Sequence, residues 1–301
     1  VFLLASYGYA GWRISFRYDK ETVRWFFQLG WRFLGSRSLE VVYTELDRLV
    51  IKSMNNYVQV GLYDRAAMGA RYPARIVTPA IINIALPVYS RLKADKAQLS
   101  EAYTLVSYFL VRVLLPFGLI FLLLPEAFMA AVLGSKWLHA APVLRVLAMY
   151  AVLHPMVENF RVLFYSLGRP EEVAKVRVLQ IIAFIPCLFG MVLWFGVIGA
   201  AWALLGTILL TYVVFVFRAK RCIRYPVLTT NALPVLIAAL SAVVYLVLPL
   251  PVFENVFCEL LVGSALILAI FISFELLFEG RTLARHYSYF RGLLKSPAVN
   301  A

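Results

Sequence analysis

The chain has 301 residues, and its apolar content of 62%, charged content of 15% and mean hydropathy of +0.81 exclude an ordinary soluble protein. The formal net charge of +13 does not indicate a nucleic-acid partner, because no basic stretch carries interleaved aromatic residues on a polar background. It is typical instead of a membrane protein that gathers Lys and Arg in its cytoplasmic loops. The three cysteines and three histidines have no metal-binding spacing, so we expect no metal and no cofactor.

Long apolar runs predict an all-α protein, a polytopic bundle of transmembrane helices. Every backbone polar group must be satisfied internally in hydrocarbon, and the alternation of a β-barrel strand is absent. The first 12 residues resemble the end of a preceding span, so we expect a fragment that lacks upstream sequence. Eight full spans of about 20 residues follow. We place them at 26–53, 62–90, 101–124, 140–167, 174–194, 199–217, 227–249 and 256–278.

Loop charge gives the expected orientation. Lys and Arg collect in alternate turns and in the C-terminal tail, whereas the opposite turns hold only Lys52, Arg65 and Lys136. Positive loops face the cytoplasm, so the sequence predicts a cytoplasmic C-terminus.

Ionisable side chains also lie inside the expected spans, where they are costly and usually mark a substrate path or a buried pair. They have two interpretations. The first is internal ion pairs that hold helices in register, such as Glu45 with Arg48. The second is a cavity for an anionic group, which is favoured because arginines outnumber the nearby carboxylates and match phosphate geometry. The candidate cavity residues are Arg48, Arg71, Arg75, Arg112, Asp47, Tyr43, Glu158, Arg161 and Tyr165.

Two prolines bracket Arg75 within the span expected at 62–90. Proline removes a backbone hydrogen bond and kinks a helix, so Pro73 and Pro79 are the candidate hinge residues. No catalytic motif that pairs a nucleophile with a base appears, and neither does a P-loop. We therefore assign no catalytic residue and do not expect an enzyme.

Four stretches resemble the polysaccharide flippases of the multidrug/oligosaccharidyl-lipid/polysaccharide exporter superfamily. They are LDRLVIKSMNNYVQVGLYDRAA (46–67), INIALPVYSRLKAD (82–95), LGSKWLHAAPVLRVLA (133–148) and LGRPEEVAK (167–175). The resemblance implies two six-helix bundles that face each other across a central cavity, with two further helices in some members. It also implies translocation of undecaprenyl-diphosphate-linked sugar units across the bacterial inner membrane by alternating access.

On this resemblance the chain is the C-terminal part of such a flippase. Residues 1–25 would end a preceding span and form a cytoplasmic loop, 26–217 would be the C-terminal six-helix transport bundle, 218–278 two additional transmembrane helices, and 279–301 a basic cytoplasmic tail. The expected partners are a lipid-linked oligosaccharide, membrane lipids and the missing N-terminal bundle of the same chain.

The resemblance also implies roles for the charged residues. Arg71 and Arg75, with Arg48 and Arg112, would bind phosphate; Asp47 would pair with one of them or couple an ion. Tyr43 and Tyr165 would stack on sugar rings.

Three alternatives stay open. A multidrug/cation antiporter of the same superfamily would need a cavity dominated by carboxylates and aromatic residues. A membrane glycan polymerase or ligase would need a long external loop with a catalytic Arg or His. A purely structural membrane subunit would need neither.

Overall fold

The computed structural model describes residues 20, 23–24, 45–53, 57–248 and 255–295. The chain divides into two compact units, residues 1–45 and 46–301. In the first unit the few described residues are all helical. Tyr43, a predicted site residue, lies outside the described part of the chain, as does most of the span expected at 26–53.

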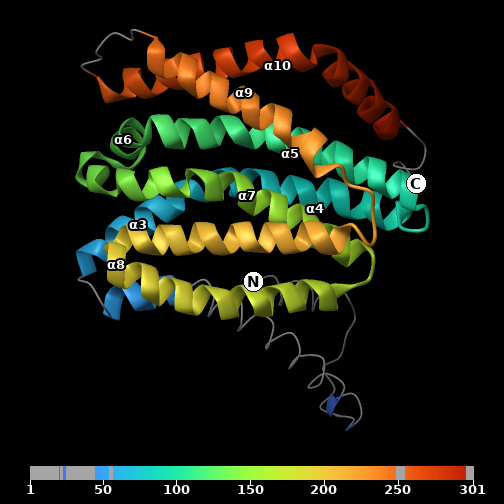
Figure 1. Ribbon diagram of the computed structural model, residues 1–301, viewed down its shortest axis with the longest axis horizontal. Coiled ribbons are helices and arrows are strands. Elements are labelled where there is room, and N and C mark those ends of the chain that lie inside the picture. Colours follow the sequence, from blue (N-terminus) through green and yellow to red (C-terminus); the bar gives the residue numbers. More distant parts are fainter. Residues whose placement is uncertain (1–19, 21–22, 25–44, 54–56, 249–254, 296–301) are drawn as a thin grey trace, which may run out of the picture. The chain divides into compact units, whose positions relative to one another are not determined.

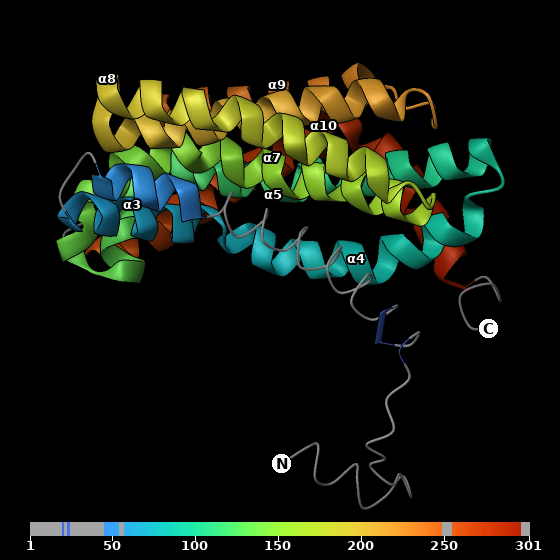
Figure 2. The ribbon, with the colours of Figure 1, turned by 90° about the horizontal axis from the view of Figure 1, so that it is seen from below.

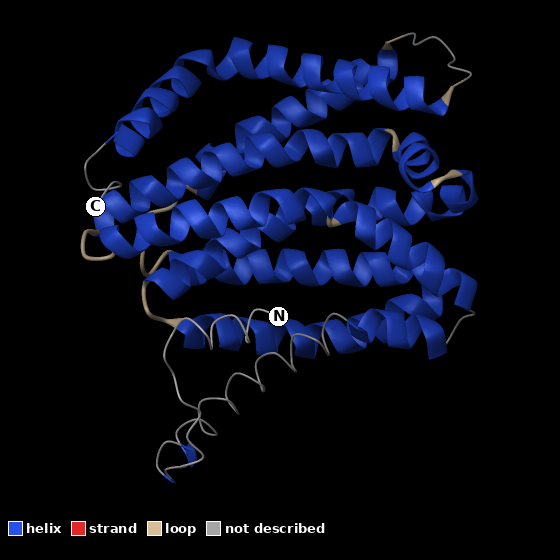
Figure 3. Ribbon diagram, turned by 180° about the vertical axis from the view of Figure 1, so that it is seen from behind, coloured by secondary structure: helices blue, strands red, loops and turns tan. Residues whose placement is uncertain are grey.

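The second unit is built from helices and short loops, as Figure 3 shows for the described residues, so the prediction of an all-α fold is confirmed. Its elements in chain order (Figure 1) are a helix at 45–53, α3 (Tyr57–Ala70), α4 (Tyr72–Leu92), α5 (Lys96–Leu123), α6 (Pro125–Phe128), η1 (Met129–Leu133), η2 (Ser135–Ala140), α7 (Ala141–Ser166), α8 (Pro170–Ala219), α9 (Val227–Val247) and α10 (Val256–Lys295).

Five helices among the described residues are long and apolar enough to cross a membrane. They are α5, the segment Ser135–Ser166 that contains α7, α8, and the stretches Thr230–Val247 of α9 and Val256–Gly280 of α10. These segments coincide with the spans expected between residues 101 and 278. The chain is therefore a multi-pass helical membrane protein.

Helix α8 contains two of the expected spans. Its backbone leaves helical geometry at Gly196, where φ is 60° and ψ is −138°, a conformation that only glycine adopts without strain. The two halves lie side by side in Figures 1 and 2. A Cβ atom on Gly199 would overlap the backbone of Met191, so the halves approach as closely as glycine permits. They correspond to the spans expected at 174–194 and 199–217.

The span expected at 62–90 is not one helix, which corrects the prediction. Helix α3 ends at Ala70 and α4 begins at Tyr72. Pro73 explains the break, because it has no N–H for the carbonyl of Gly69 and its ring would crowd that carbonyl. Proline is favoured in the first turn of a helix, so Pro73 starts α4 rather than kinking it. Pro79 does lie inside α4.

Helix α10 continues past the span expected at 256–278 to Lys295, so the predicted tail is helical up to that residue. Helices α9 and α10 pack against each other, and both contact α5.

Helix α7 is central, because it contacts α3, α4, α5 and α8. A buried polar chain fixes its register. The Tyr89 hydroxyl of α4 donates to Asn159 Oδ1 over 3.0 Å, and Asn159 Nδ2 donates to Ser107 Oγ of α5 over 3.1 Å. Each group has its partner, so burial in this core carries little penalty. The chain of bonds holds three helices in one alignment.

Candidate functional site

A cavity of about 330 Å³ lies where the helix at 45–53, α3, the start of α4 and η2 meet. Half of its lining residues are arginines; the full set is Arg48, Gly61, Asp64, Arg65, Met68, Arg71, Arg75 and Trp137. We call it the arginine cavity. Four guanidinium groups and one carboxylate line the arginine cavity, so its electrostatic potential is positive.

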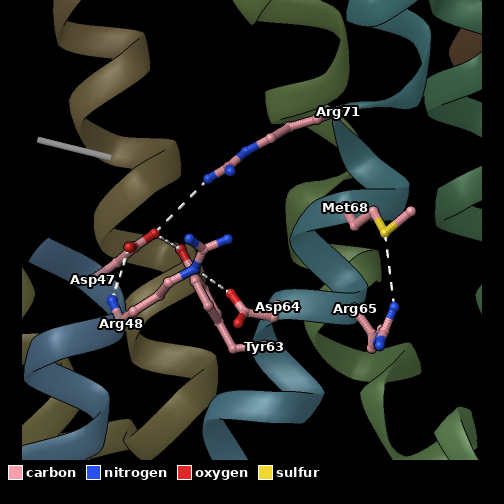
Figure 4. A network of polar contacts seen from close by, with 7 residues as sticks. All are labelled: Asp47, Arg48, Tyr63, Asp64, Arg65, Met68 and Arg71. Atoms are coloured by element: carbon pink, nitrogen blue, oxygen red, sulfur yellow. Dashed lines mark hydrogen bonds and ion pairs between the residues drawn. The ribbon is translucent and has the colours of Figure 1, made fainter. Parts of the chain in front are cut away.

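A buried carboxylate pairs with one of the arginines that line this cavity (Figure 4). Asp47 is only 2% exposed, and its Oδ2 atom accepts a hydrogen bond of 2.6 Å from the Tyr63 hydroxyl. The same oxygen lies 3.9 Å from Arg71 Nη2. A charge this deep in the protein needs both a donor and a counter-charge. Asp47 is therefore the counter-charge of Arg71, which lines the cavity.

A second pair lies on the cavity wall itself. Arg48 Nε is 2.5 Å from Asp64 Oδ1, and both side chains are about one third exposed. The helix at 45–53 thus supplies both Asp47 and Arg48, with partners on α3 and just before α4. The structure brings this helix and the break between α3 and α4 together at one site.

Two arginines of the cavity have no carboxylate partner among the described residues. The Arg65 guanidinium lies 5.0 Å from the Trp137 ring centre, and Arg65 Nη1 lies 4.0 Å from Met68 Sδ. Arg75 is exposed on α4, and its side chain has no ion pair with a described residue. These two cations are free to neutralise an anion that enters the cavity.

The predicted alignment of Arg71 and Arg75 persists across the break between α3 and α4. The Arg71 amide donates to the Ala67 carbonyl, and the Arg75 amide donates to the Arg71 carbonyl, each over 3.1 Å. These bonds keep helical spacing through the turn, so the two arginines remain one turn apart and line the same cavity.

Arg112, grouped in the sequence analysis with the phosphate ligands, does not line this cavity. It is buried on α5, where its Nε lies 3.2 Å from Glu275 Oε2 and its Nη2 contacts Glu279 Oε2. Two carboxylates of α10 therefore neutralise it. Sequence spacing gives no sign of partners so far along the chain.

The predicted residues of α7 also lie away from the arginine cavity. Arg161 pairs with Glu158, whose Oε1 also lies 3.8 Å from His154 Nε2. This arrangement matches the alternative interpretation of internal ion pairs. Tyr165 is 51% exposed and lines no part of the arginine cavity.

Sequence reasoning missed several residues of the site, among them Tyr63, Asp64, Arg65 and Trp137. Arg65 is predicted only as a charge of an external turn, Tyr63 has no charge, and Trp137 lies in the short helix η2 before α7. One signal was available, because Tyr63 and Arg65 lie in the flippase-like stretch 46–67 and Trp137 in the stretch 133–148.

A larger, apolar groove of about 630 Å³ lies between α5, α7, α8 and α9. Its wall is almost entirely hydrocarbon, with Arg145, Tyr212 and Asn231 as its polar side chains. Asn231 Nδ2 donates to the Tyr212 hydroxyl over 2.9 Å, so these two polar groups are satisfied within the protein. The groove offers an apolar surface to a hydrocarbon chain.

Residues 1–142 match a family described as "Polysaccharide biosynthesis protein". Among curated proteins, the teichuronic acid biosynthesis protein TuaB of Bacillus subtilis (strain 168) is 25% identical over 160 residues, which are 53% of this chain and 33% of that protein. The succinoglycan biosynthesis transport protein ExoT of Rhizobium meliloti (strain 1021) is 26% identical over 116 residues, which are 38% of this chain and 24% of that protein.

The chain thus aligns with about a third or less of the length of these relatives. Among solved structures, the lipid II flippase MurJ in an inward closed conformation has the same fold, with a TM-score of 0.74 and 13% sequence identity. The match covers 89% of this chain and 57% of that one. The N-terminal part of the chain is thus similar to a polysaccharide biosynthesis family, and the chain shares its fold with MurJ.

Proposed function

We propose that the chain is the C-terminal part of a flippase that translocates undecaprenyl-diphosphate-linked polysaccharide units across the bacterial inner membrane by alternating access. The sugar-diphosphate head would bind in the arginine cavity. A second helical bundle, from sequence upstream of this chain, would form the opposite wall. The cytoplasmic C-terminus predicted from loop charge belongs to the same proposal.

The observation that carries the proposal is the charge balance of the arginine cavity. Arg48 and Arg71 have carboxylate partners, whereas Arg65 and Arg75 have none in the described residues. Two guanidinium groups without a carboxylate partner give the cavity a positive electrostatic potential that attracts an anion. Arginine donates two parallel hydrogen bonds to a phosphate, so a diphosphate offers the charge and geometry that the surplus requires.

The charge balance of the arginine cavity also argues against a multidrug or cation antiporter. A multidrug or cation antiporter would present carboxylates to its substrate, but the carboxylates near this cavity, Asp47 and Asp64, are already paired with arginines. A cation would meet Arg65 and Arg75 instead. The fold also favours a transporter over a glycan polymerase or ligase.

Two other features of the chain, a proline in α4 and the apolar groove, suit transport by alternating access. Arg75 and Pro79 lie on the same helix, α4, four residues apart. A bend at Pro79 would change the direction in which the arginine faces, as alternating access requires. The apolar groove between α5, α7 and α9 would take part of a polyprenyl tail while the head occupies the cavity.

Glycan export in a host that lacks its own copy of the gene tests the proposal. In the full-length protein, Arg75→Ala should lower export at least tenfold and Arg75→Lys should lower it less, with unchanged protein level in the membrane. A charge-assisted hydrogen bond contributes about 1.5–3 kcal/mol, or roughly ten- to a hundredfold.

The matched control is Arg169→Ala, because Arg169 is an exposed arginine outside both the arginine cavity and the apolar groove. It should export at the wild-type rate. Wild-type export by Arg75→Ala would contradict the proposal.

A further inference from the structure

A second cluster of charges lies in the interface between α5 and α10, apart from the arginine cavity. Arg112 projects from α5, and Glu275 and Glu279 project from α10. All three are buried, with exposed fractions of 8%, 6% and 7%. Tyr108 completes the cluster, since its ring centre lies 3.3 Å from the Arg112 guanidinium carbon.

The charges of this cluster do not balance within the described residues. One guanidinium faces two carboxyl groups, and Tyr108 adds only a neutral hydroxyl. Helix α9, which packs on both α5 and α10, contains no Asp, Glu, Lys, Arg or His. Helix α6 and η1 also contact α10, and their single charged residue, Glu126, pairs with Arg145.

The two carboxyl groups have different surroundings. Glu279 Oε2 contacts Arg112 Nη2 and accepts a hydrogen bond of 2.9 Å from the Tyr108 hydroxyl. Glu275 has one contact, from Arg112 Nε to its Oε2 over 3.2 Å. Its Oε1 atom is buried without a hydrogen-bond partner. A carboxylate charge is therefore well supported at Glu279 and poorly supported at Glu275.

An uncompensated charge in a buried interface is unfavourable, so two carboxyl groups that share one counter-charge retain a proton between them. The neighbouring cavity strengthens this requirement, because it is apolar apart from Arg112 and Glu275. These two carboxyl groups suit a proton better than a metal cation. Arg112 already occupies the carboxylates, and no group of three acidic, His or Cys side chains that could hold a metal lies among the described residues.

We propose that Glu275 and Glu279 form a proton-binding site, which holds one dissociable proton beside Arg112 and releases it when α10 moves away from α5. The bound proton sits on Glu275, and the Arg112–Glu279 pair remains ionised. Loss of the proton leaves a second negative charge in the interface, so deprotonation weakens the docking of α10. This site is independent of the function proposed for the arginine cavity.

Infrared spectroscopy of the purified full-length protein in lipid nanodiscs tests the proposal, since a protonated carboxyl group has its own C=O absorption band. At neutral pH the wild type should show the band of one buried protonated carboxyl group. Glu275→Gln and Glu279→Gln should each abolish it, because either change leaves one carboxylate for one guanidinium. Arg112→Gln should increase the band, because two carboxyl groups then lack a counter-charge.

Glu126→Gln is the matched control, because it removes an exposed carboxylate and should leave the band unchanged. Thermal unfolding adds a second readout that does not need Arg112→Gln to fold. The folded wild type holds a proton that the unfolded chain loses, so its stability should fall as the pH rises. Both single Gln variants should lose this slope. A band and a pH slope that survive in Glu275→Gln would overturn the proposal.

Discussion

Replacement of Tyr63 by phenylalanine removes one hydroxyl group from the support of Asp47 and leaves the packing of the ring in place. The hydroxyl donates to Asp47 Oδ2 over 2.6 Å, and both residues are at least 98% buried. A hydrogen bond to a charged group contributes about 1.5–3 kcal/mol to stability. Because the Asp47 carboxylate is buried from solvent, we expect Tyr63→Phe to lose the whole contribution of this hydrogen bond.

Reversible unfolding of the purified protein in mixed micelles measures this loss. Tyr63→Phe should shift the unfolding equilibrium roughly ten- to a hundredfold. Tyr57→Phe is the control, since Tyr57 is 76% exposed and keeps its ring beside Lys52. If the two variants were equally stable, the reasoning that Asp47 is a buried carboxylate held by Tyr63 would be refuted.

Three further predictions concern other parts of the molecule. Gly118→Ala should destabilise the packing of α5 on α7 by about 1–3 kcal/mol, because the new Cβ would lie 2.7 Å from Val152 Cγ2; adding Val152→Ala should restore stability in the same unfolding assay. Pro79→Ala should stiffen α4 and slow glycan export without lowering the membrane level of the protein, and unchanged export would leave Pro79 a packing residue. A fluorescent-protein fusion at Lys295 should be bright and a phosphatase fusion inactive, and an active phosphatase would reverse the predicted orientation.

Apolar length predicted the helices well because an apolar run without strand alternation can span a bilayer only as a helix. The expected spans over 101–124, 140–167, 227–249 and 256–278 match helices in the structure. The failure at 62–90 has a local cause, Pro73, whose missing donor is visible in the sequence. The hydropathy pattern continues through that break, so a window of apolar residues cannot detect it.

The candidate site was predictable only where its residues are close in sequence. Arg71 and Arg75 line one cavity because helical spacing aligns residues four apart. The position of Arg112 outside this cavity was not predictable, because its partners, Glu275 and Glu279, are on α10, and local spacing does not reveal contacts between distant helices. Trp137 joined the site for the same reason, since only the packing of η2 against α3 brings it there.

The central claim is that the arginine cavity binds a polyprenyl diphosphate. Binding of fluorescently labelled undecaprenyl diphosphate to the purified full-length protein tests it most directly, with the matching monophosphate as the control ligand. We predict tighter binding of the diphosphate, and an affinity at least tenfold lower in Arg75→Lys and in Arg71→Lys, because lysine lacks the planar pair of donors. Equal affinity of the wild type and both variants for the diphosphate would contradict the account.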